Sequence, residues 1–170
     1  MDGPIFLSKI DSETQWLESY DLFPTRREVL VQPAPDPASL TELLETGTDS
    51  YDFVQRSEDG PTRVVGFDRL TGDEVVIDGE PLLVTEFQAR HETTSGTILE
   101  LTGNEYVSVR HRRFLGGTYS GTGPNGSFES DGSPVDFIYP GEPGFFTKTP
   151  LYDCESSLAR YVPTVKGYDQ

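Results

Sequence analysis

The residues with the most distinctive chemistry in this sequence form a short basic run, Arg110-His111-Arg112-Arg113. No Asp or Glu occurs from Tyr106 to Phe128, although the chain as a whole carries 29 acidic and 13 basic residues. The planar guanidinium group of arginine binds a carboxylate through two parallel hydrogen bonds and keeps its charge in any site. The run therefore predicts a cluster that binds carboxylates.

Alternation along residues 106–115 places Val107 and Val109 on the same face of a strand as His111 and Arg113. Because a buried, unpaired arginine is costly, we expect this strand to leave the core beyond Val109 or to meet acidic residues from elsewhere. Three partners fit the basic side chains: carboxylates of the same chain, an acidic surface of a neighbouring subunit, and nucleic acid.

A second candidate surface is the acid-free aromatic segment "GFFTKTPLY", residues 144–152. Packing in the core is the alternative explanation for Phe145 and Phe146. Aromatic side chains in a loop bounded by Pro and Gly also serve as anchors at protein interfaces. The predicted protein interface consists of Arg110, His111, Arg112, Arg113, Phe145, Phe146, Lys148 and Tyr152.

The stretch from Gly121 to Gly126 has the spacing G-x-G-x-x-G of a dinucleotide-binding loop. Such a loop must open a helix whose N-terminus meets the pyrophosphate, and the following residues "SFESDGSP" do not start one. A hairpin turn with Asn125-Gly126 at its tip is therefore the better interpretation. Asn125 also begins a glycosylation sequon, but the N-terminus has no recognisable secretory signal, which disfavours modification.

Few residues are spaced for metal binding or catalysis. His91 and His111 lack the spacing of metal ligands, and the acidic clusters at 49–52, 58–59 and 129–131 lack that of a calcium-binding EF-hand loop. Cys154 is the single cysteine, which excludes a disulfide within the chain. No nucleophile motif or phosphate-binding loop occurs. We therefore predict no cofactor, no metal and no catalytic residue, and expect a protein that is not an enzyme.

The charge is the strongest global property of the chain. The formal net charge is −16, and the 13 basic residues comprise three lysines and ten arginines. Acid excess with few lysines resembles proteins of salt-loving microbes, in which molar salt shortens the Debye length to about 3 Å and removes repulsion between surface carboxylates. Such a field repels phosphate, so we expect no general binding to nucleic acid or to membranes. No apolar run is long enough for a membrane helix.

Two short helices are predicted near the N-terminus. Ser12–Gln15 resembles a capping box, and Trp16, Leu17 and Tyr20 follow at helical spacing. Residues 36–47 combine an aspartate cap, a proline in the first turn, a face of leucines and a closing glycine.

From about Tyr51 onward, short β-rich runs alternate with turns predicted at 58–61, 71–73, 78–79 and 103–104. This spacing is typical of antiparallel hairpins that form a β-barrel or β-sandwich. Residues 116–136 are predicted to form a loop, and 137–152 two further strands. The predicted fold is mainly β and a single domain. Residues 1–50 form an N-terminal arm with one or two short helices, 51–155 the barrel or sandwich body, and 156–170 an extended C-terminal arm.

In broad design these features resemble the small structural virion proteins of tailed viruses: head–tail connectors, tail-completion proteins and capsid-decorating subunits. The resemblance implies a non-enzymatic assembly protein that docks on other structural subunits in a homo- or hetero-oligomer, in the virion or the cytoplasm of a halophilic host. Two alternatives stay open. One is a binding module for sugar or peptide that uses Trp16, Tyr119 or Tyr139, and the other is an uncharacterised enzyme.

Overall fold

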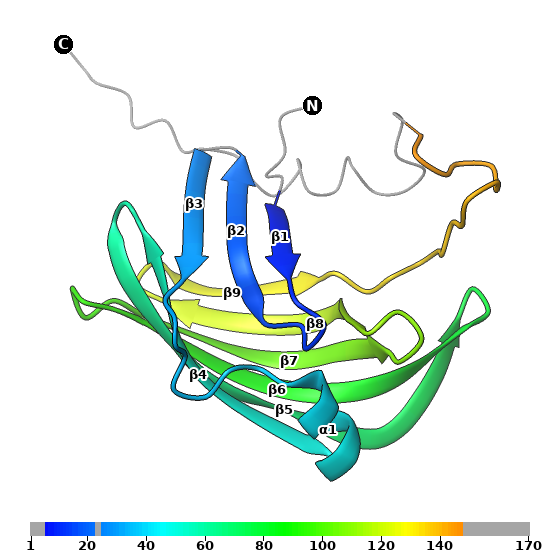
Figure 1. Ribbon diagram of the computed structural model, residues 1–170, viewed down its shortest axis with the longest axis horizontal. Helices are drawn as coiled ribbons and strands as arrows, with labels where there is room; N and C mark the ends of the chain where they lie inside the picture. The colour runs from blue at the N-terminus through cyan, green and yellow to red at the C-terminus, as the bar shows by residue number, and fades with distance from the viewer. Residues whose placement is uncertain (1–5, 23–24, 148–170) are drawn as a thin grey trace.

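Nine antiparallel strands and one short helix make up the part of the chain that this computed structural model describes, residues 6–22 and 25–147 (Figure 1). The elements are β1 (Phe6–Ile10), β2 (Trp16–Leu22), β3 (Thr25–Leu30), α1 (Leu40–Thr46), β4 (Thr48–Ser57), β5 (Gly60–Ile77), β6 (Glu80–Thr93), β7 (Ile98–Ser108), β8 (Arg113–Gly123) and β9 (Gly126–Asp131). Each strand pairs with the next one in sequence, so the order in the sheet is β1 to β9. The prediction of a mainly β fold built from antiparallel hairpins is confirmed.

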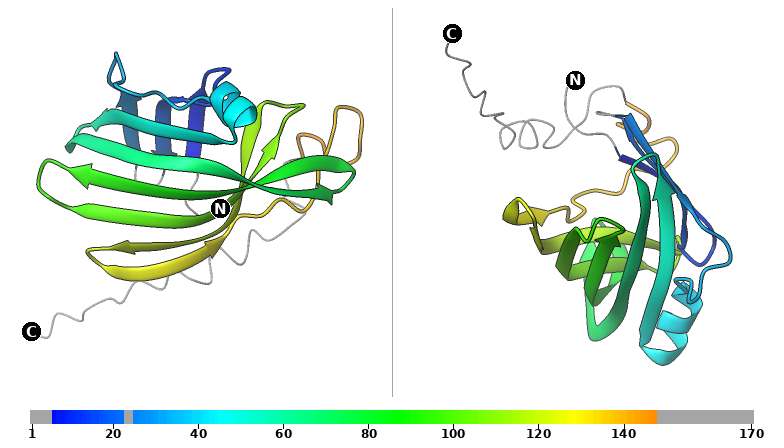
Figure 2. Two further views of the ribbon diagram at one scale, coloured as in Figure 1. Left: turned by 90° about the horizontal axis from the view of Figure 1, so that it is seen from below. Right: turned by 90° about the vertical axis from the view of Figure 1, so that its left-hand side faces the viewer.

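The sheet curls into a half-barrel. Strands β4–β9 form a curved trough, and β1–β3 run at a steep angle to them on its open side (Figures 1 and 2). The register joins β3 to β4 only through Val29 with Arg56 and Leu30 with Gln55. The sheet therefore turns a corner at this short junction, which brings β1 and β2 over the concave face of the trough.

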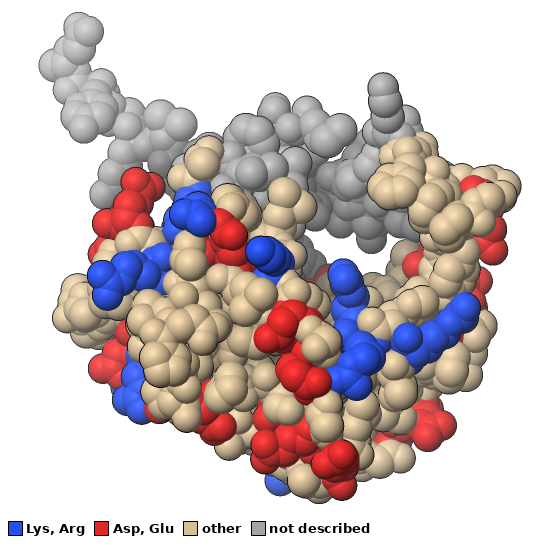
Figure 3. Space-filling view, in the orientation of Figure 1, with Lys and Arg blue, Asp and Glu red and all other residues tan. Residues whose placement is uncertain are grey.

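The outward-facing side chains of the trough form ion pairs between strands. Arg69 lies opposite Glu86 across β5 and β6, and Arg90 lies opposite Glu100 across β6 and β7. Opposite charges in directly facing positions stabilise an antiparallel pair modestly. Basic and acidic side chains are interspersed over the face drawn in Figure 3. Several arginines of this acidic chain form ion pairs with acidic residues of the same chain.

Two apolar clusters lie on the concave side. Their buried members are Leu30, Phe53 and Val64 in the first cluster and Leu40, Leu43 and Val107 in the second. Alternation along β5 places Val64, Gly66, Asp68 and Leu70 on this face, with Val64 in the first cluster and Leu70 packed against the second. Between the clusters, β5 therefore contributes no large apolar side chain.

The helix predicted for residues 36–47 is confirmed with a later start. Ser39 is its N-cap, since the Ser39 hydroxyl accepts a hydrogen bond from the Glu42 amide, and Gly47 ends it at φ 84°. Asp36 does not cap the helix because its backbone pairs with Asp52 of β4.

The helix predicted from Ser12 to Tyr20 is wrong. The Asp11 carboxylate accepts hydrogen bonds from the backbone amides of Glu13 and Gln15, which folds these residues into a tight turn between β1 and β2. Residues typical of a helix cap therefore form a turn here, because the same side-chain hydrogen bonds to backbone amides stabilise both structures.

The single strand predicted across residues 106–115 is also wrong. β7 ends at Ser108, a turn follows at 109–112, and β8 begins at Arg113. The segment 116–136, predicted as a loop, contains most of the β8–β9 hairpin, whose strands pair as far as Gly123 with Gly126. The hairpin turn predicted near Asn125 is thus confirmed.

Of the four turns predicted between 58 and 104, two are confirmed and two are wrong. Those at 58–61 and 78–79 join β4 to β5 and β5 to β6. Those at 71–73 and 103–104 are wrong, because there the register shifts within the continuous strands β5 and β7. Such irregularities bend strands and help to curl the sheet. Residues 137–147 form no strand, so the first of the two strands predicted there is wrong.

The segment before residue 51 is part of the sheet. β4 crosses the predicted boundary, and β1–β3 continue the same strand order. The C-terminal arm predicted at 156–170 lies outside the described residues and stays a prediction.

Candidate functional site

A cavity of about 380 Å³ lies on the concave side of the half-barrel. Its walls come from β1 and β2 on one side and from β4–β8 on the other, so it occupies the space between the two parts of the sheet. The aromatic residues of its lining are Trp16, Tyr51, Phe53, Phe87, Phe114 and Tyr119. A cavity of this size with mostly apolar walls is typical of a small-molecule site.

Glycines opposite large rings shape this cavity. Gly66 faces Tyr51 across β4 and β5, and Gly103 faces Tyr119 across β7 and β8. A Cβ atom on Gly66 would lie 2.7 Å from the Tyr51 ring, and one on Gly103 would lie 2.6 Å from Cα of Tyr119. Both positions therefore need glycine, because the Tyr51 ring covers Gly66 and the backbone at Tyr119 lies close against Gly103.

Asp68 is the most unusual group in the cavity wall. Its side chain lies on the concave face of β5, and the residue is only 8% exposed. No hydrogen bond or ion pair from the described part of the chain reaches its carboxyl group. Burial raises the pKa of Asp68 to about 8, and the negative charges of Glu105 and Asp49 contribute to the shift.

Three further ionisable side chains of the lining are shifted toward their neutral forms. Burial raises the pKa of Glu105 to about 7 and raises that of the Tyr51 phenol. Burial lowers the pKa of His91, so this imidazole carries no charge at neutral pH. Apolar surroundings thus hold several groups that a polar ligand or a reacting molecule could use.

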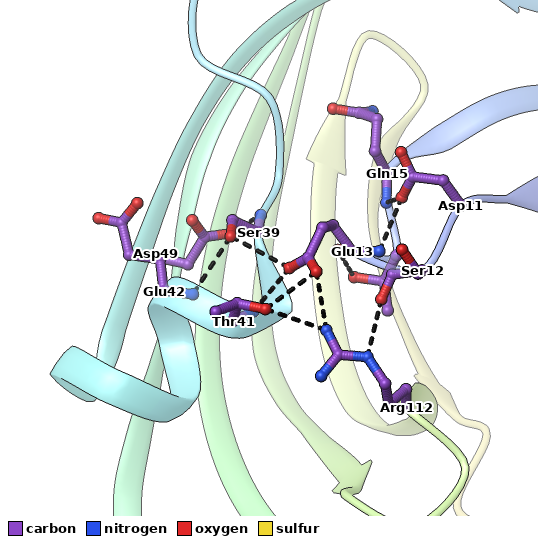
Figure 4. Close-up of polar contacts among 10 residues, drawn as sticks. Asp11, Ser12, Glu13, Gln15, Ser39, Thr41, Glu42, Asp49 and Arg112 are labelled. Atoms are coloured by element: carbon purple, nitrogen blue, oxygen red, sulfur yellow. Dashed lines mark hydrogen bonds and ion pairs between the residues drawn. The ribbon is translucent and has the colours of Figure 1, made fainter.

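The turn between β1 and β2 covers the cavity, and hydrogen bonds from the start of α1 and from Arg112 hold it in place (Figure 4). The Glu13 carboxylate accepts hydrogen bonds from the Thr41 amide at 2.8 Å and the Thr41 hydroxyl at 2.9 Å. The Leu40 amide donates to the Glu13 carbonyl, and the Ala38 amide donates to the Gln15 side chain. These bonds join the turn to the start of α1 and so hold Trp16 over the cavity.

Arg112 supplies the second set of hydrogen bonds to the β1–β2 turn. Its guanidinium group donates to the Ser12 carbonyl at 3.0 Å, to Glu13 at 2.9 Å and to the Thr41 hydroxyl at 3.1 Å. The Thr41 hydrogen bonds and this positive charge together hold the pKa of Glu13 below its usual value. Arg112 has φ 47°, an unfavourable conformation for arginine, which these three contacts help to maintain. Among the predicted interface residues, Arg112 thus binds its own chain.

Arg110 and His111 belong to a separate cluster around the buried Glu80. The hydroxyls of Ser108 and Tyr139 donate to Glu80 at 2.7 and 3.2 Å, and the first of these bonds is the main reason that the pKa of Glu80 is lowered. Arg110 Nη1 and His111 Nε2 each lie 3.6 Å from a Glu80 carboxylate oxygen. This cluster attaches the segment after β9 to the β5–β6 hairpin.

The other predicted interface residues have different surroundings. Arg113 lines the cavity, is exposed, and makes no hydrogen bond or ion pair with the described residues. Phe145 and Phe146 stack edge to face with ring centroids 4.5 Å apart, and Phe146 is 91% exposed. Core packing therefore does not account for Phe146. Lys148 and Tyr152 lie outside the described residues.

The structure brings together two of the three aromatic residues proposed for a binding module. Trp16 and Tyr119 both line the cavity, whereas Tyr139 packs beside His111 in the Glu80 cluster. Sequence reasoning missed Asp68 and Glu105. A signal exists for both, since each acidic residue stands at an inward position of a strand whose other inward positions are apolar or glycine.

No protein-family model, curated protein or solved structure matches this chain. Within residues 6–22 and 25–147, no group of three His, Cys, Asp or Glu side chains is arranged to hold a metal ion. The same residues contain no helix long and apolar enough to cross a membrane. The geometry of the cavity is therefore the basis for assigning a function.

Proposed function

We propose that this protein binds a small organic molecule with an apolar, ring-containing body in the concave cavity of the half-barrel. The observation that carries the proposal is Asp68, a buried carboxyl that no described residue partners, in a cavity walled by aromatic rings. Buried polar groups in folded proteins nearly always have a hydrogen-bond partner. A bound molecule would supply the partner that the described residues do not.

The walls support a ligand with a flat apolar body. Phe87 and Tyr119 lie with ring centroids 6.5 Å apart, and Tyr51 and Phe53 lie 5.8 Å apart, so ring faces and edges surround the space. Aromatic side chains contribute large contact area at little cost in conformational entropy. The small side chain of Ala89 on β6 leaves room beside these rings.

The experiment uses the intrinsic fluorescence of Trp16, the single tryptophan of the chain. We expect the neutral probe N-phenyl-1-naphthylamine to quench Trp16 emission and to become strongly fluorescent itself. The Ala89→Phe variant should weaken this binding at least about tenfold because the new ring fills the cavity. Gln88→Phe is the matched control, since Gln88 is exposed on the opposite face of the same strand. Equal binding to both variants would show that the probe binds elsewhere.

A second candidate function is the assembly role predicted from the sequence, as a virion component that docks on neighbouring subunits. Arg110 is 68% exposed although its guanidinium lies near Glu80, so part of its hydrogen-bonding capacity faces solvent. The exposed Phe145–Phe146 pair is the other feature that favours docking on a protein partner. A virion or halophilic setting for the chain stays a proposal.

A further inference from the structure

We propose that the ligand of the cavity carries a protonated amine, which lies between the carboxyl groups of Asp68 and Glu105. This inference rests on the proposed function, because it names the chemical class of the molecule that the cavity binds. Three observations support it: the placement of the two carboxyl groups, the lack of a paired cation among the described residues, and the aromatic rings in the same cavity.

The sheet register places both carboxyl groups on the concave face, on either side of β6. Asp68 of β5 pairs with Phe87, and Glu105 of β7 pairs with Thr85, two residues earlier on β6. The curl of the trough turns these side chains toward the same space, and both line the cavity. The Thr85 hydroxyl, between them on β6, donates to the Glu105 backbone carbonyl at 3.2 Å, so its proton serves neither carboxyl.

Within residues 6–22 and 25–147, no positive charge is paired with these two carboxyl groups. The basic residues of the cavity lining are His91, whose imidazole is neutral, and Arg113, which is exposed at the start of β8. Burial is the main cause of the raised pKa of Asp68, and the charged groups that add to it are the acidic Glu105 and Asp49. One oxygen of Asp49 binds the Ser39 amide at 2.9 Å, and its other oxygen is buried without a partner. These acidic groups therefore raise the pKa of Asp68 beyond the effect of burial, and a bound cation would stabilise their charged forms.

The rings beside the carboxyl groups suit an ammonium ion. Phe87 of β6 lies directly opposite Asp68 of β5, and Tyr119 packs against Phe87 from β8. A cation over an aromatic face is attracted by the ring quadrupole, most strongly where water is excluded. The same surroundings argue against an anion, which would meet two acidic groups. A hard metal ion would need about six oxygen ligands, more than this pair provides.

The test compares three molecules of equal length that differ only in their end group: 4-phenylbutylamine, 4-phenylbutanol and 4-phenylbutanoate. Each competes with N-phenyl-1-naphthylamine bound to the full chain at pH 7.5 and fixed salt. We expect the amine to displace the probe at a concentration at least about tenfold lower than the alcohol, and the carboxylate to be the weakest. Equal displacement by amine and alcohol would overturn the proposal.

Two variants locate the charge. Asp68→Asn and Glu105→Gln keep the shape of each side chain and remove its charge, so both should lose most of the preference for the amine over the alcohol. Glu100→Gln is the matched control, because Glu100 lies on the outward face of β7 and pairs with Arg90. A preference for the amine that survives in both Asp68→Asn and Glu105→Gln would also overturn the proposal.

The outcomes separate this inference from the proposed function. If the probe binds in the cavity but the three end groups compete equally, the cavity takes an apolar molecule and the amine assignment fails. If the probe binds Ala89→Phe as well as the unmodified protein, the proposed function itself fails.

Discussion

The Nη2 atom of Arg112 lies 2.9 Å from Oε1 of Glu13, and this contact joins two turns that are 99 residues apart in the sequence. One turn connects β1 to β2 and carries Trp16, and the other connects β7 to β8. The contact therefore joins the β1–β2 turn, which lies over the cavity, to the β7–β8 turn of the trough. It also shows that Arg112, one residue of the basic run 110–113, binds a carboxylate of its own chain.

Loss of the Arg112–Glu13 contact should loosen the β1–β2 turn over the cavity. Arg112→Ala deletes three hydrogen bonds, two of which hold the Ser12–Glu13 turn, so we expect a loss of about 1–3 kcal/mol in the free energy of unfolding and a red shift of Trp16 emission. Urea titrations followed by fluorescence measure both. Arg90→Ala, which removes an exposed pair with Glu100, should cost less than about 1 kcal/mol. Equal effects of the two variants would contradict a special role for Arg112.

The buried Asp68 should make the fold less stable as the pH rises. Its pKa is about 8 in the folded chain and about 3.9 in the unfolded chain, so between these values the folded state binds more protons. The associated stability is fully present below pH 4 and is lost progressively up to pH 8, by about 1.4 kcal/mol for each pH unit.

Asp68→Asn should remove this part of the pH dependence, and urea titrations at pH 5, 6.5 and 8 can measure the change. Asp73→Asn, at an exposed position of β5, is the control and should leave the slope unchanged. A slope unaffected by Asp68→Asn would show that this carboxyl is hydrated or paired in solution.

Gly103 should tolerate no side chain. A Cβ atom there would lie 2.6 Å from both Cα and Cβ of Tyr119, and a strand backbone cannot easily move away. We expect Gly103→Ala to cost about 1–3 kcal/mol and to shift the ring that lines the cavity. Gly132→Ala is the control, since its nearest neighbour would be 3.8 Å away and the cost should be below about 0.5 kcal/mol. Thermal unfolding of the two variants gives the comparison.

The net charge of −16 predicts that salt stabilises the fold. Raising potassium chloride from 0.1 to 2 M should increase the midpoint of thermal unfolding by several degrees, because screening removes repulsion between surface carboxylates. Part of this gain should be offset by weaker ion pairs such as Arg69 with Glu86. A midpoint that falls with salt would contradict the halophilic interpretation of the composition.

The assembly hypothesis predicts a change in molar mass. If the chain docks on copies of itself, light scattering in molar potassium chloride should detect an oligomer, and Arg110→Glu combined with Phe146→Ser should return it to the monomer. Both side chains are exposed, so this variant should fold normally. Arg112 is unsuitable for this test because its loss disturbs the cover of the cavity. An oligomer unaffected by the double variant would exclude this interface.

The sequence was sufficient for the β4–β5 and β5–β6 hairpins. Glu58–Pro61 and Asp78-Gly79 separate β-rich runs, and such residues favour tight turns through their own backbone preferences. The failures have local causes too. Ser12–Gln15 carries the residues of a helix cap, but the Asp11 carboxylate uses the same kind of hydrogen bond to form a turn. A seven-residue strand such as β2 is too short for its apolar spacing to distinguish strand from helix.

Alternation and turn residues thus determined, from the sequence alone, that much of the chain forms antiparallel strands. The tertiary structure decided which of the faces is enclosed. Asp68 and Tyr119 are 51 positions apart, and only the curl of the sheet and the turn at Glu13 place them around one space beneath Trp16. The physical reason is that burial, and with it the ionisation of a carboxyl, depends on how distant strands close over it and not on the residues beside it in sequence.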